Sequence, residues 1–394
     1  MTKPKILLHT DIGSDIDDAL SLLTMLNHPE IELAGIYTVN GDVDSRCYIA
    51  QHLVNLAGKK IPVARGAAEP IGAEVLPYSL GLEKYLIDHS FFDEKRMKKE
   101  GSVELLFRPL KSVGIIPQGL KHFAQQLLQE RHVVFSIAPL TNLALLLREH
   151  PQAARNIERL YIMGGRLPSG QNLEHNLRYD AAAAKQVLGS GIPTTIIPAD
   201  ICNNYRMPVS CSEQLLTLPG QYVHRMLDAF LGGRVVGEFL RKVIAGENLY
   251  GILNKMVTVD PEKASQLPPE EDLRIRRKKD QIIKNLDFPA AYSEPQEFWE
   301  DYRGLIELLK NPRYNFKLGL RMAEELEELI TYNVAIHDVY VPYSYLHPER
   351  LVVEQMSLTC DESGRTYVIP GSDHEVVRGF DWDHFRGFVQ EYIK

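Results

Sequence analysis

The chain has 394 residues, of which 44% are hydrophobic and 24% are charged, an ordinary globular composition with ample length for a large core. Its formal net charge of −8 argues against a general nucleic-acid binder, which normally carries a basic balance. The sequence has no apolar run of about 18 residues, and no charged segment with a following apolar segment precedes the first strand, so we expect neither a transmembrane helix nor a secretion signal. We therefore expect a cytoplasmic protein whose partners are neither nucleic acids nor membranes.

The N-terminal stretch combines a buried strand with a dense group of acids. Residues 6–8 are apolar, and an apolar rhythm typical of a helix begins at residue 16. Four carboxylates lie within eight residues where the strand gives way to the helix: Asp11, Asp15, Asp17 and Asp18. Acids that close raise each other's pKa unless something positive lies among them, and Ca²⁺ collects about six to eight oxygen ligands. The pattern therefore favours a metal or catalytic site over a solvated acidic turn with a helix cap.

Strands and helices then alternate at short spacing through the first 200 residues. The predicted strands cover residues 31–42, 61–64, 133–137, 160–163 and 194–200. Helices are predicted between them, over 45–57 and 120–131, after 137, and from 181 onward. This order is typical of a parallel sheet covered by helices, in which ligands bind beyond the carboxyl ends of the strands. Asp11 and Asp42 would both lie at that edge.

Two stretches depart from the alternation. Residues 74–118 are weakly patterned and indicate a partly helical excursion. Residues 212–330 are rich in helix formers and charge, so we expect a helical insertion or lid within a single catalytic domain that spans 1–394. The basic run at 274–279 is typical of a solvated helix face.

The C-terminal part contains a second polar group at a strand end. A short apolar strand over 334–336 is followed at once by His337 and Asp338. Three further elements close the chain, two hairpin strands and an amphipathic helix: residues 351–360, 367–369 and 382–393. A histidine opposite an acidic cation site suggests a general acid facing a metal-held water.

Six short motifs follow these predicted strand ends or lie in adjoining loops. They are H-T-D-I-G-S-D-I-D-D-A from residue 9, T-V-N-G-D from 38, S-I-A-P-L-T-N from 136, M-G-G from 163, E-H-N from 174 and H-D from 337. In this order the set resembles the nucleoside hydrolases of the inosine-uridine preferring type, over about residues 1–70, 120–205 and 333–394.

The resemblance implies a fold and an activity. The fold would be α/β, with a mainly parallel, Rossmann-like central sheet flanked by helices. The activity would be Ca²⁺-dependent hydrolysis of the N-glycosidic bond of a ribonucleoside or related N-riboside, giving ribose and free base for purine or pyrimidine salvage. The partner would be this small molecule, and the protein would be a homo-oligomer, either a dimer or a tetramer.

The resemblance also implies roles for individual residues. Asp11 would hold Ca²⁺ and take a proton from the attacking water, and His337 would protonate the leaving base. Three further Ca²⁺ ligands would be Asp18, Asp338 and the backbone carbonyl of Ile137. The substrate would be bound by Asp17, Asn176, Glu174, Met163 and Asp42.

The acidic turn departs from the family's pattern. Two residues are added before the Asp17-Asp18 pair, so Asp15 has no clear counterpart. We count it as a candidate metal ligand; it could also contact the substrate or replace Asp11 as the base. The family's first Asp is His9 here and its Pro is Ile12. The large insertion means that base preference does not transfer.

Three alternatives compete with this interpretation. A phosphohydrolase of the haloacid dehalogenase type needs a second Asp two residues after Asp11, where Gly13 stands. A helix–loop–helix calcium loop needs a bidentate Glu at its twelfth position, which is Leu22. A nucleoside- or sugar-binding protein on the same scaffold, without turnover, stays open because the acidic turn is altered.

Overall fold

The computed structural model of the chain describes residues 4–13, 15–72, 114–167, 173–208, 215–224, 226–227 and 333–393. The chain divides into two compact units, one made of Met1–His224 with Val334–Lys394 and the other of Arg225–Asn333. Nearly all of the second unit lies outside the described residues. The predicted excursion over 74–118 and the predicted insertion over 212–330 also fall mostly outside them, so both stay predictions.

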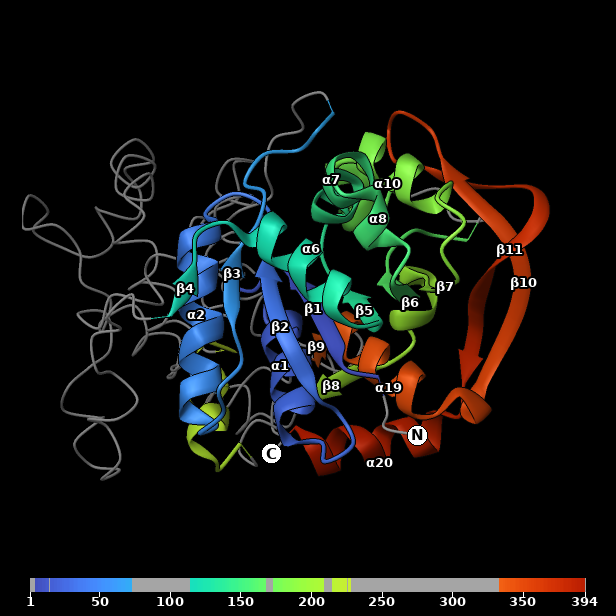
Figure 1. Cartoon of the computed structure of the whole chain (residues 1–394). Helices are drawn as coiled ribbons and strands as arrows, with labels where there is room; N and C mark the ends of the chain where they lie inside the picture. The colour runs from blue at the N-terminus through green and yellow to red at the C-terminus, as the bar shows by residue number, and fades with distance from the viewer. Residues whose placement is uncertain are drawn as a thin grey trace, which may run out of the picture. The chain divides into compact units, whose positions relative to one another are not determined.

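A nine-stranded sheet forms the centre of the first unit, in the order β10-β11-β7-β6-β5-β1-β2-β3-β4 (Figure 1). Its strands are β1 (Ile6–Thr10), β2 (Leu33–Thr38), β3 (Val63–Arg65), β4 (Ile115–Ile116), β5 (His132–Ser136), β6 (Ile157–Met163), β7 (Thr194–Ile197), β10 (Leu351–Cys360) and β11 (Thr366–Phe380). Among these strands only the pairing of β10 with β11 is antiparallel. The predicted α/β fold with a mainly parallel sheet is confirmed.

Strand β1 lies in the middle of the sheet and is buried along its whole length. Its Leu8 pairs with Ile36 of β2 on one side and with Phe135 of β5 on the other. A parallel strand covered on both faces needs the continuous apolar run that begins this chain. From β1 the chain proceeds outward to β4 and then returns to β5 on the other side of β1. Ligands in open α/β sheets bind at such a switch point, beyond the carboxyl ends of the strands.

Helices cover both faces of the sheet (Figure 1). They are α1 (Asp17–Asn27), α2 (Val43–Leu56), α6 (Gly119–Gln129), α7 (Thr141–Glu149), α8 (Pro151–Ala154), α9 (His175–Tyr179), α10 (Ala181–Leu188), α11 (Ala199–Cys202), α19 (Tyr340–Leu346) and α20 (Trp382–Tyr392). Helices α6, α7, α8 and α10 pack in succession, whereas α1 packs against α2, α19 and α20. Right-handed connections that run in opposite directions from the switch point put these two groups on opposite faces. No helix of the described residues is long and apolar enough to cross a membrane.

The strand before His337 differs from its prediction. Strand β9 (Asn333–Ala335) pairs with β8 (Arg206–Pro208) in a separate two-stranded sheet. The strand therefore does not belong to the main parallel sheet, and what was wrong is only the expectation that it does. The 3₁₀ helix η4 (His337–Val339) follows β9 and packs against α1 instead. The predicted hairpin of β10 and β11 does join the main sheet. The part of β11 that lies farther from the hairpin turn pairs in parallel with β7.

Candidate active site

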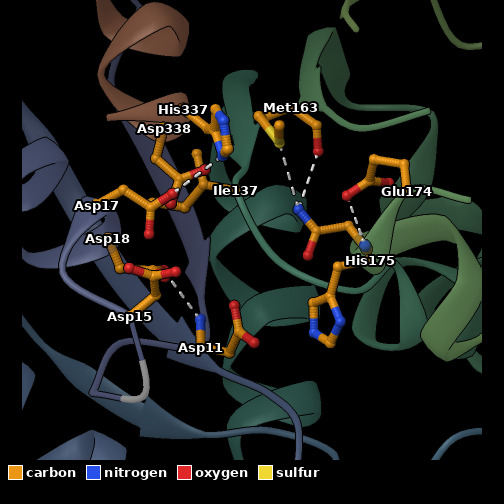
Figure 2. A pocket seen from close by; sticks show the side chains of 11 residues that line it. Asp11, Asp15, Asp17, Asp18, Ile137, Met163, Glu174, His175, His337 and Asp338 are labelled. Atoms are coloured by element: carbon orange, nitrogen blue, oxygen red, sulfur yellow. Dashed lines mark hydrogen bonds and ion pairs between the residues drawn. The ribbon is translucent and has the colours of Figure 1, made fainter. Parts of the chain in front are cut away.

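A pocket of about 290 Å³ opens at the carboxyl ends of β1, β5 and β6 (Figure 2). Of the eleven residues predicted as site residues, ten line it: Asp11, Asp15, Asp17, Asp18, Ile137, Met163, Glu174, Asn176, His337 and Asp338. The eleventh lining residue, His175, was not predicted. The pocket therefore lies at the switch point and gathers residues from both ends of the chain.

Three buried carboxylates form a compact group on one wall of the pocket. Asp17, Asp18 and Asp338 each offer one oxygen, and these oxygens all lie within 4.8 Å of one another. Burial and the neighbouring acids raise the pKa of each of the three carboxyl groups. A bound cation relieves both costs, and an all-oxygen set of protein carboxylates is the donor chemistry that Ca²⁺ takes. The residues therefore fit a divalent cation of this kind.

Hydrogen bonds fix this group to the strand and helix ends around it. Asp18 Oδ1 accepts from the hydroxyl of Thr10 and, at 3.1 Å, from the backbone N–H of Asp11. Ser21 Oγ of α1 donates to the carbonyl of Asp338 at 2.9 Å. The end of β1, the first turns of α1 and η4 are thus held together around the three carboxylates.

Asp11 and Asp15 line the same pocket. Among the described residues, the close group of carboxylates consists of Asp17, Asp18 and Asp338 and does not include these two. Asp11 Oδ2 accepts from the side-chain amide of Asn40 at 2.9 Å. Asp15 accepts from the backbone N–H of Ile16 at 2.7 Å. Asn40, at the end of β2, is thus a residue near the site that sequence reasoning missed. Its signal was the Asn-Gly pair that follows the strand, since Asn40 adopts a φ of 73°.

Asp42 does not belong to the residues that line the pocket. Its Oδ1 accepts from the backbone N–H of Ser45 at 3.1 Å and its Oδ2 from the hydroxyl of the same residue at 2.7 Å. This is the geometry of an N-cap, here at the start of α2. The structure therefore gives Asp42 a helix-capping position and leaves its predicted substrate contact without support.

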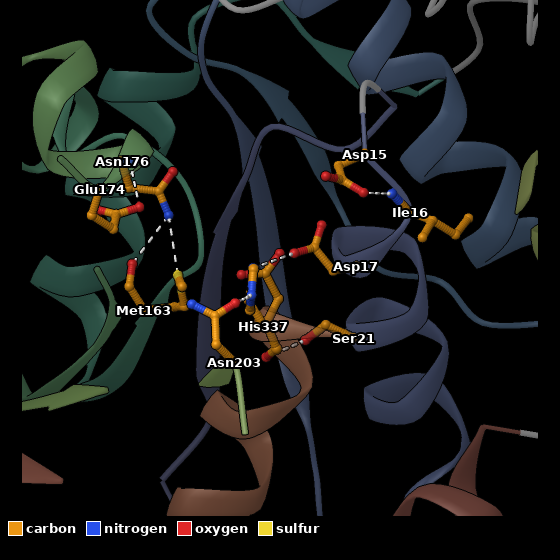
Figure 3. A network of polar contacts seen from close by, with 10 residues as sticks. Asp15, Ile16, Asp17, Ser21, Met163, Glu174, Asn176, Asn203 and His337 are labelled. Atoms are coloured by element: carbon orange, nitrogen blue, oxygen red, sulfur yellow. Dashed lines mark hydrogen bonds and ion pairs between the residues drawn. The ribbon is translucent and has the colours of Figure 1, made fainter. Parts of the chain in front are cut away.

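The imidazole of His337 lies between two polar groups (Figure 3). Its Nδ1 is 3.6 Å from Oδ2 of Asp17, and its Nε2 is 3.1 Å from Oδ1 of Asn203. Burial lowers the pKa of His337 to about 4, with Arg206 and Arg166 adding to the effect. The neutral imidazole carries one N–H: a hydrogen on Nε2 would be donated to Oδ1 of Asn203, and a hydrogen on Nδ1 would face the Asp17 carboxylate. Asn203, which follows α11, is a second residue that sequence reasoning missed.

Glu174 and Asn176 form the opposite wall and are fixed by the end of β6. Glu174 accepts from the backbone N–H groups of Asn176, Gly165 and Leu177, at 2.7, 2.9 and 3.0 Å. Asn176 donates to the carbonyl of Met163 at 3.1 Å. Burial raises the pKa of Glu174, and these three N–H groups oppose the rise. The wall therefore presents a rigid carboxylate and amide to whatever occupies the pocket.

His175 stands between these two residues in the E-H-N motif, where the family pattern has Phe. Its side chain lies across the pocket from Asp11 (Figure 2). The signal that could have marked it is its place between two predicted site residues, Glu174 and Asn176.

Comparisons with known proteins identify the family of the chain. Residues 6–387 match the family model described as inosine-uridine preferring nucleoside hydrolase. A curated relative, the non-specific ribonucleoside hydrolase RihC of Klebsiella pneumoniae (strain 342), is 30% identical over 240 residues, which cover 58% of this chain and 72% of the relative.

Solved structures share the fold. A purine-preferring ribonucleoside hydrolase from Gardnerella vaginalis superposes with a TM-score of 0.58 at 16% identity, covering 99% of this chain and 98% of that chain. The type III effector protein XopQ, complexed with adenosine diphosphate ribose, has the same TM-score and identity over 99% of this chain and 93% of that chain. At such identities the likeness concerns the fold alone.

Proposed function

The chain belongs to the inosine-uridine preferring nucleoside hydrolase family and is an N-glycosyl hydrolase, and from this premise we propose that it uses Ca²⁺ to release ribose and a free base from a ribonucleoside or related N-riboside. The observation that carries the proposal is the approach of the Asp17, Asp18 and Asp338 oxygens to within 4.8 Å at the wall of the pocket. The facing wall of Glu174 and Asn176 offers hydrogen-bonding groups of the kind that a sugar needs.

The ion would be held by the most deeply buried carboxylates of the pocket. Asp18 and Asp338 are 4% and 3% exposed, whereas Asp17 is 7% exposed and faces His337. We therefore assign Asp18 and Asp338 to the ion, with Asp11, Asp15 and the carbonyl of Ile137 as further ligands. A bound divalent ion lowers the pKa of a water and orients it beside the sugar. Ca²⁺ suits this site better than Mg²⁺, which usually keeps several waters rather than a cage of protein ligands.

Asp11 is assigned as the base. Its Oδ2 is occupied by the Asn40 amide, so Oδ1 is the oxygen that would take the proton from the attacking water. The water oxygen bonds to the anomeric carbon as the bond from that carbon to the base nitrogen breaks, and the electron pair leaves with the base. The transition state resembles an oxocarbenium ion, so the surrounding carboxylates stabilise it.

Asp17, Glu174 and Asn176 are assigned to the ribose hydroxyls. Asp17 starts α1 on the metal side, whereas Glu174 and Asn176 are fixed by backbone N–H groups and by Met163 on the other side. A sugar between these walls would be gripped from two rigid elements. Such positioning contributes to the rate as well as to affinity.

His337 is assigned to the leaving base. Burial and two nearby guanidinium groups disfavour its charged form and lower its pKa to about 4. We therefore propose that the neutral ring donates its Nε2 hydrogen to the departing base as negative charge develops there, exchanging Asn203 for the base as acceptor. The base then leaves as an anion that accepts this hydrogen bond, and it takes its proton from solvent.

A binding protein without turnover is the second candidate. Asp15 favours it, because this additional carboxylate lines the pocket at the lengthened turn and could occupy the place of the attacking water. The phosphohydrolase alternative loses its ground, because the family match covers residues 6–387.

Ribose release from a panel of purine and pyrimidine ribonucleosides tests the proposal. The protein is stripped with a chelator and assayed for reducing sugar with and without added Ca²⁺. We expect release from at least one nucleoside only when Ca²⁺ is present. Ribose that binds but is never released would support the second candidate. Activity that survives the chelator would remove the ion from the proposal.

The remaining expectations concern the assembly and the cell. A dimer or tetramer, a cytoplasmic location and a role in base salvage stay predictions drawn from the family resemblance. Light scattering of the purified protein tests the first of them.

A further inference from the structure

Arg46 joins the two loops that carry Asp11 and Asn40. It lies on the first turn of α2 and its side chain is fully buried, with 0% exposure. Its Nε donates to the carbonyl of Asn40 at 2.7 Å, and its Nη1 donates to the carbonyl of Ile12 at 3.1 Å and to that of Asp11. One guanidinium thus contacts the turn after β1 and the turn after β2.

A buried guanidinium destabilises the fold unless its N–H groups are hydrogen-bonded and its charge is compensated by nearby negative groups. The three carbonyls accept hydrogen bonds from the N–H groups of Nε and Nη1. The acidic pocket compensates the positive charge. Burial and Asp11 raise the pKa of Asp18, and the positive charge of Arg46 opposes that rise, so the two groups attract each other. The pocket and the arginine therefore lower each other's electrostatic cost, which gives Arg46 a reason to lie beneath the acidic turn.

A hydrogen bond joins the two loops directly, and Arg46 contacts both residues that form it. The amide of Asn40 donates to Oδ2 of Asp11 at 2.9 Å. Arg46 fixes the main chain of Asp11 and the main chain of Asn40, which has the strained φ of 73°. Without the guanidinium, each loop would be free to move, and a displacement of the Asp11 carboxylate by about 1 Å is enough to make it unproductive.

We propose that Arg46 is a positioning residue, which sets the carboxylate of Asp11 by fixing the two loops through their backbone carbonyls. The inference rests on the proposed function, in which Asp11 is the base. The ribose contacts come from α1 and from the loop after β6, which Arg46 does not touch in the contacts described. Loss of Arg46 should therefore impair turnover more than substrate binding.

The test compares Arg46→Met and Arg46→Lys with Cys47→Ala as the matched control. Cys47 is the next residue of α2, is fully buried, and contacts Thr38 rather than the acidic turn. With saturating Ca²⁺, we expect kcat of Arg46→Met to fall about a hundredfold, as for a misplacement of about 1 Å, with KM changed by no more than about threefold. Arg46→Lys keeps the charge but lacks the planar fork, so we expect it to recover little of kcat.

Hydrogen exchange of the metal-free protein supplies a readout independent of activity. The backbone N–H groups of Asp11, Asn40 and Gly41 are hydrogen-bonded in these loops. We expect peptides that cover residues 11–13 and 40–42 to exchange faster in Arg46→Met, with β5 unchanged and with Cys47→Ala like the parent.

Several outcomes would overturn the proposal. They are unchanged exchange in either loop, a kcat within twofold of the parent, a rise in KM with kcat preserved, or a kcat of Arg46→Lys equal to that of the parent. If Arg46→Met does not fold, Arg46→Lys carries the same test. A parent that hydrolyses no nucleoside would defeat the proposed function, and the exchange result would still decide whether Arg46 fixes both loops.

Discussion

Nδ1 of His337 lies 3.6 Å from Oδ2 of Asp17, although the two residues come from opposite ends of the chain. Asp17 begins α1 and His337 begins η4, and the hydrogen bond from Ser21 to the carbonyl of Asp338 holds these two elements together. The candidate metal ligands and the residue assigned to the leaving base are therefore built as one unit. Variants can separate the two roles because each residue has its own partners.

Asp18→Ala should abolish Ca²⁺ binding. Asp18 supplies a buried oxygen to the close group and is fixed by Thr10 and Asp11. Loss of residues that merely orient metal ligands costs about 10–100-fold in affinity, so loss of this ligand should cost more than a hundredfold. Isothermal titration with Ca²⁺ measures the effect. Asp42→Asn is the control, because that carboxylate caps α2 outside the pocket lining and should leave affinity unchanged. Equal affinities of the Asp18→Ala variant and the parent would contradict the assignment.

His337→Gln should slow turnover and spare the ion. Assistance to a leaving group is typically worth about 10²–10⁴ in rate, so we expect kcat to fall within that range. The affinity for Ca²⁺ should stay within about threefold, because His337 contacts Asp17 and Asn203 rather than the pair assigned to the ion. Steady-state kinetics and calcium titration of the same preparation measure both.

Asn203→Leu is the companion variant to His337→Gln. It removes the acceptor that orients the ring and should lower kcat by less than the loss of the ring itself. A His337→Gln enzyme as fast as the parent would remove the histidine from the mechanism.

The positions of most site residues followed from the sequence because parallel strands end at one edge. Asp11 follows β1, Ile137 follows β5 and Met163 ends β6, and each lines the pocket. His337 was placed there by an argument that failed, since the strand before it pairs with β8 outside the main sheet. The position of His337 in the pocket depends on the packing of η4 against α1. The periodicity of apolar residues in the sequence does not predict this packing.

The site contacts of the residues that were missed depend on backbone conformation and tertiary packing, which a local sequence pattern does not show. Asn40 reaches Asp11 because its backbone is left-handed, and Arg46 reaches two loops because the first turn of α2 faces both. Asp42 was assigned to the substrate on its place in a motif. Its spacing to Ser45 was nevertheless a readable helix-capping signal, and capping is the position that the structure gives it.

The metal-free protein should become more stable as the pH is lowered from 8 toward 5. Burial first, and the neighbouring acids second, raise the folded-state pKa of Asp17, Asp18 and Asp338 above the ordinary 3.8. The folded state therefore binds protons more tightly than the unfolded chain. Its stability falls as the pH rises from about 3.8 through the raised values, and the full cost is present above them. Scanning fluorimetry of Tm against pH measures this slope.

Calcium should cancel that slope, because a bound ion compensates the same charges and stabilises the folded state by mass action. We expect Ca²⁺ to raise Tm more at pH 8 than at pH 5. Asp338→Asn removes one charge from the group, so it should flatten the metal-free slope and weaken the response to Ca²⁺. A metal-free Tm that rises between pH 5 and pH 8, together with no response to Ca²⁺, would contradict the assignment of a cation to these carboxylates.

Asn40→Gly should lower turnover without a matching loss of stability. The variant removes the amide that holds Oδ2 of Asp11 at 2.9 Å, and glycine accepts the φ of 73° without strain. We expect kcat to fall about tenfold, the size of one lost hydrogen bond to a charged group. Asn40→Ala loses the same amide and adds about 1–2 kcal/mol of left-handed strain, so it should show the same kcat and a lower Tm. Kinetics and thermal melting of the two variants, measured side by side with saturating Ca²⁺, test this. The contrary result would be a kcat and a Tm that both fall in the same order, from the parent to Asn40→Gly and then to Asn40→Ala. In that case the Asn40 amide would stabilise the fold, and other groups would position Asp11.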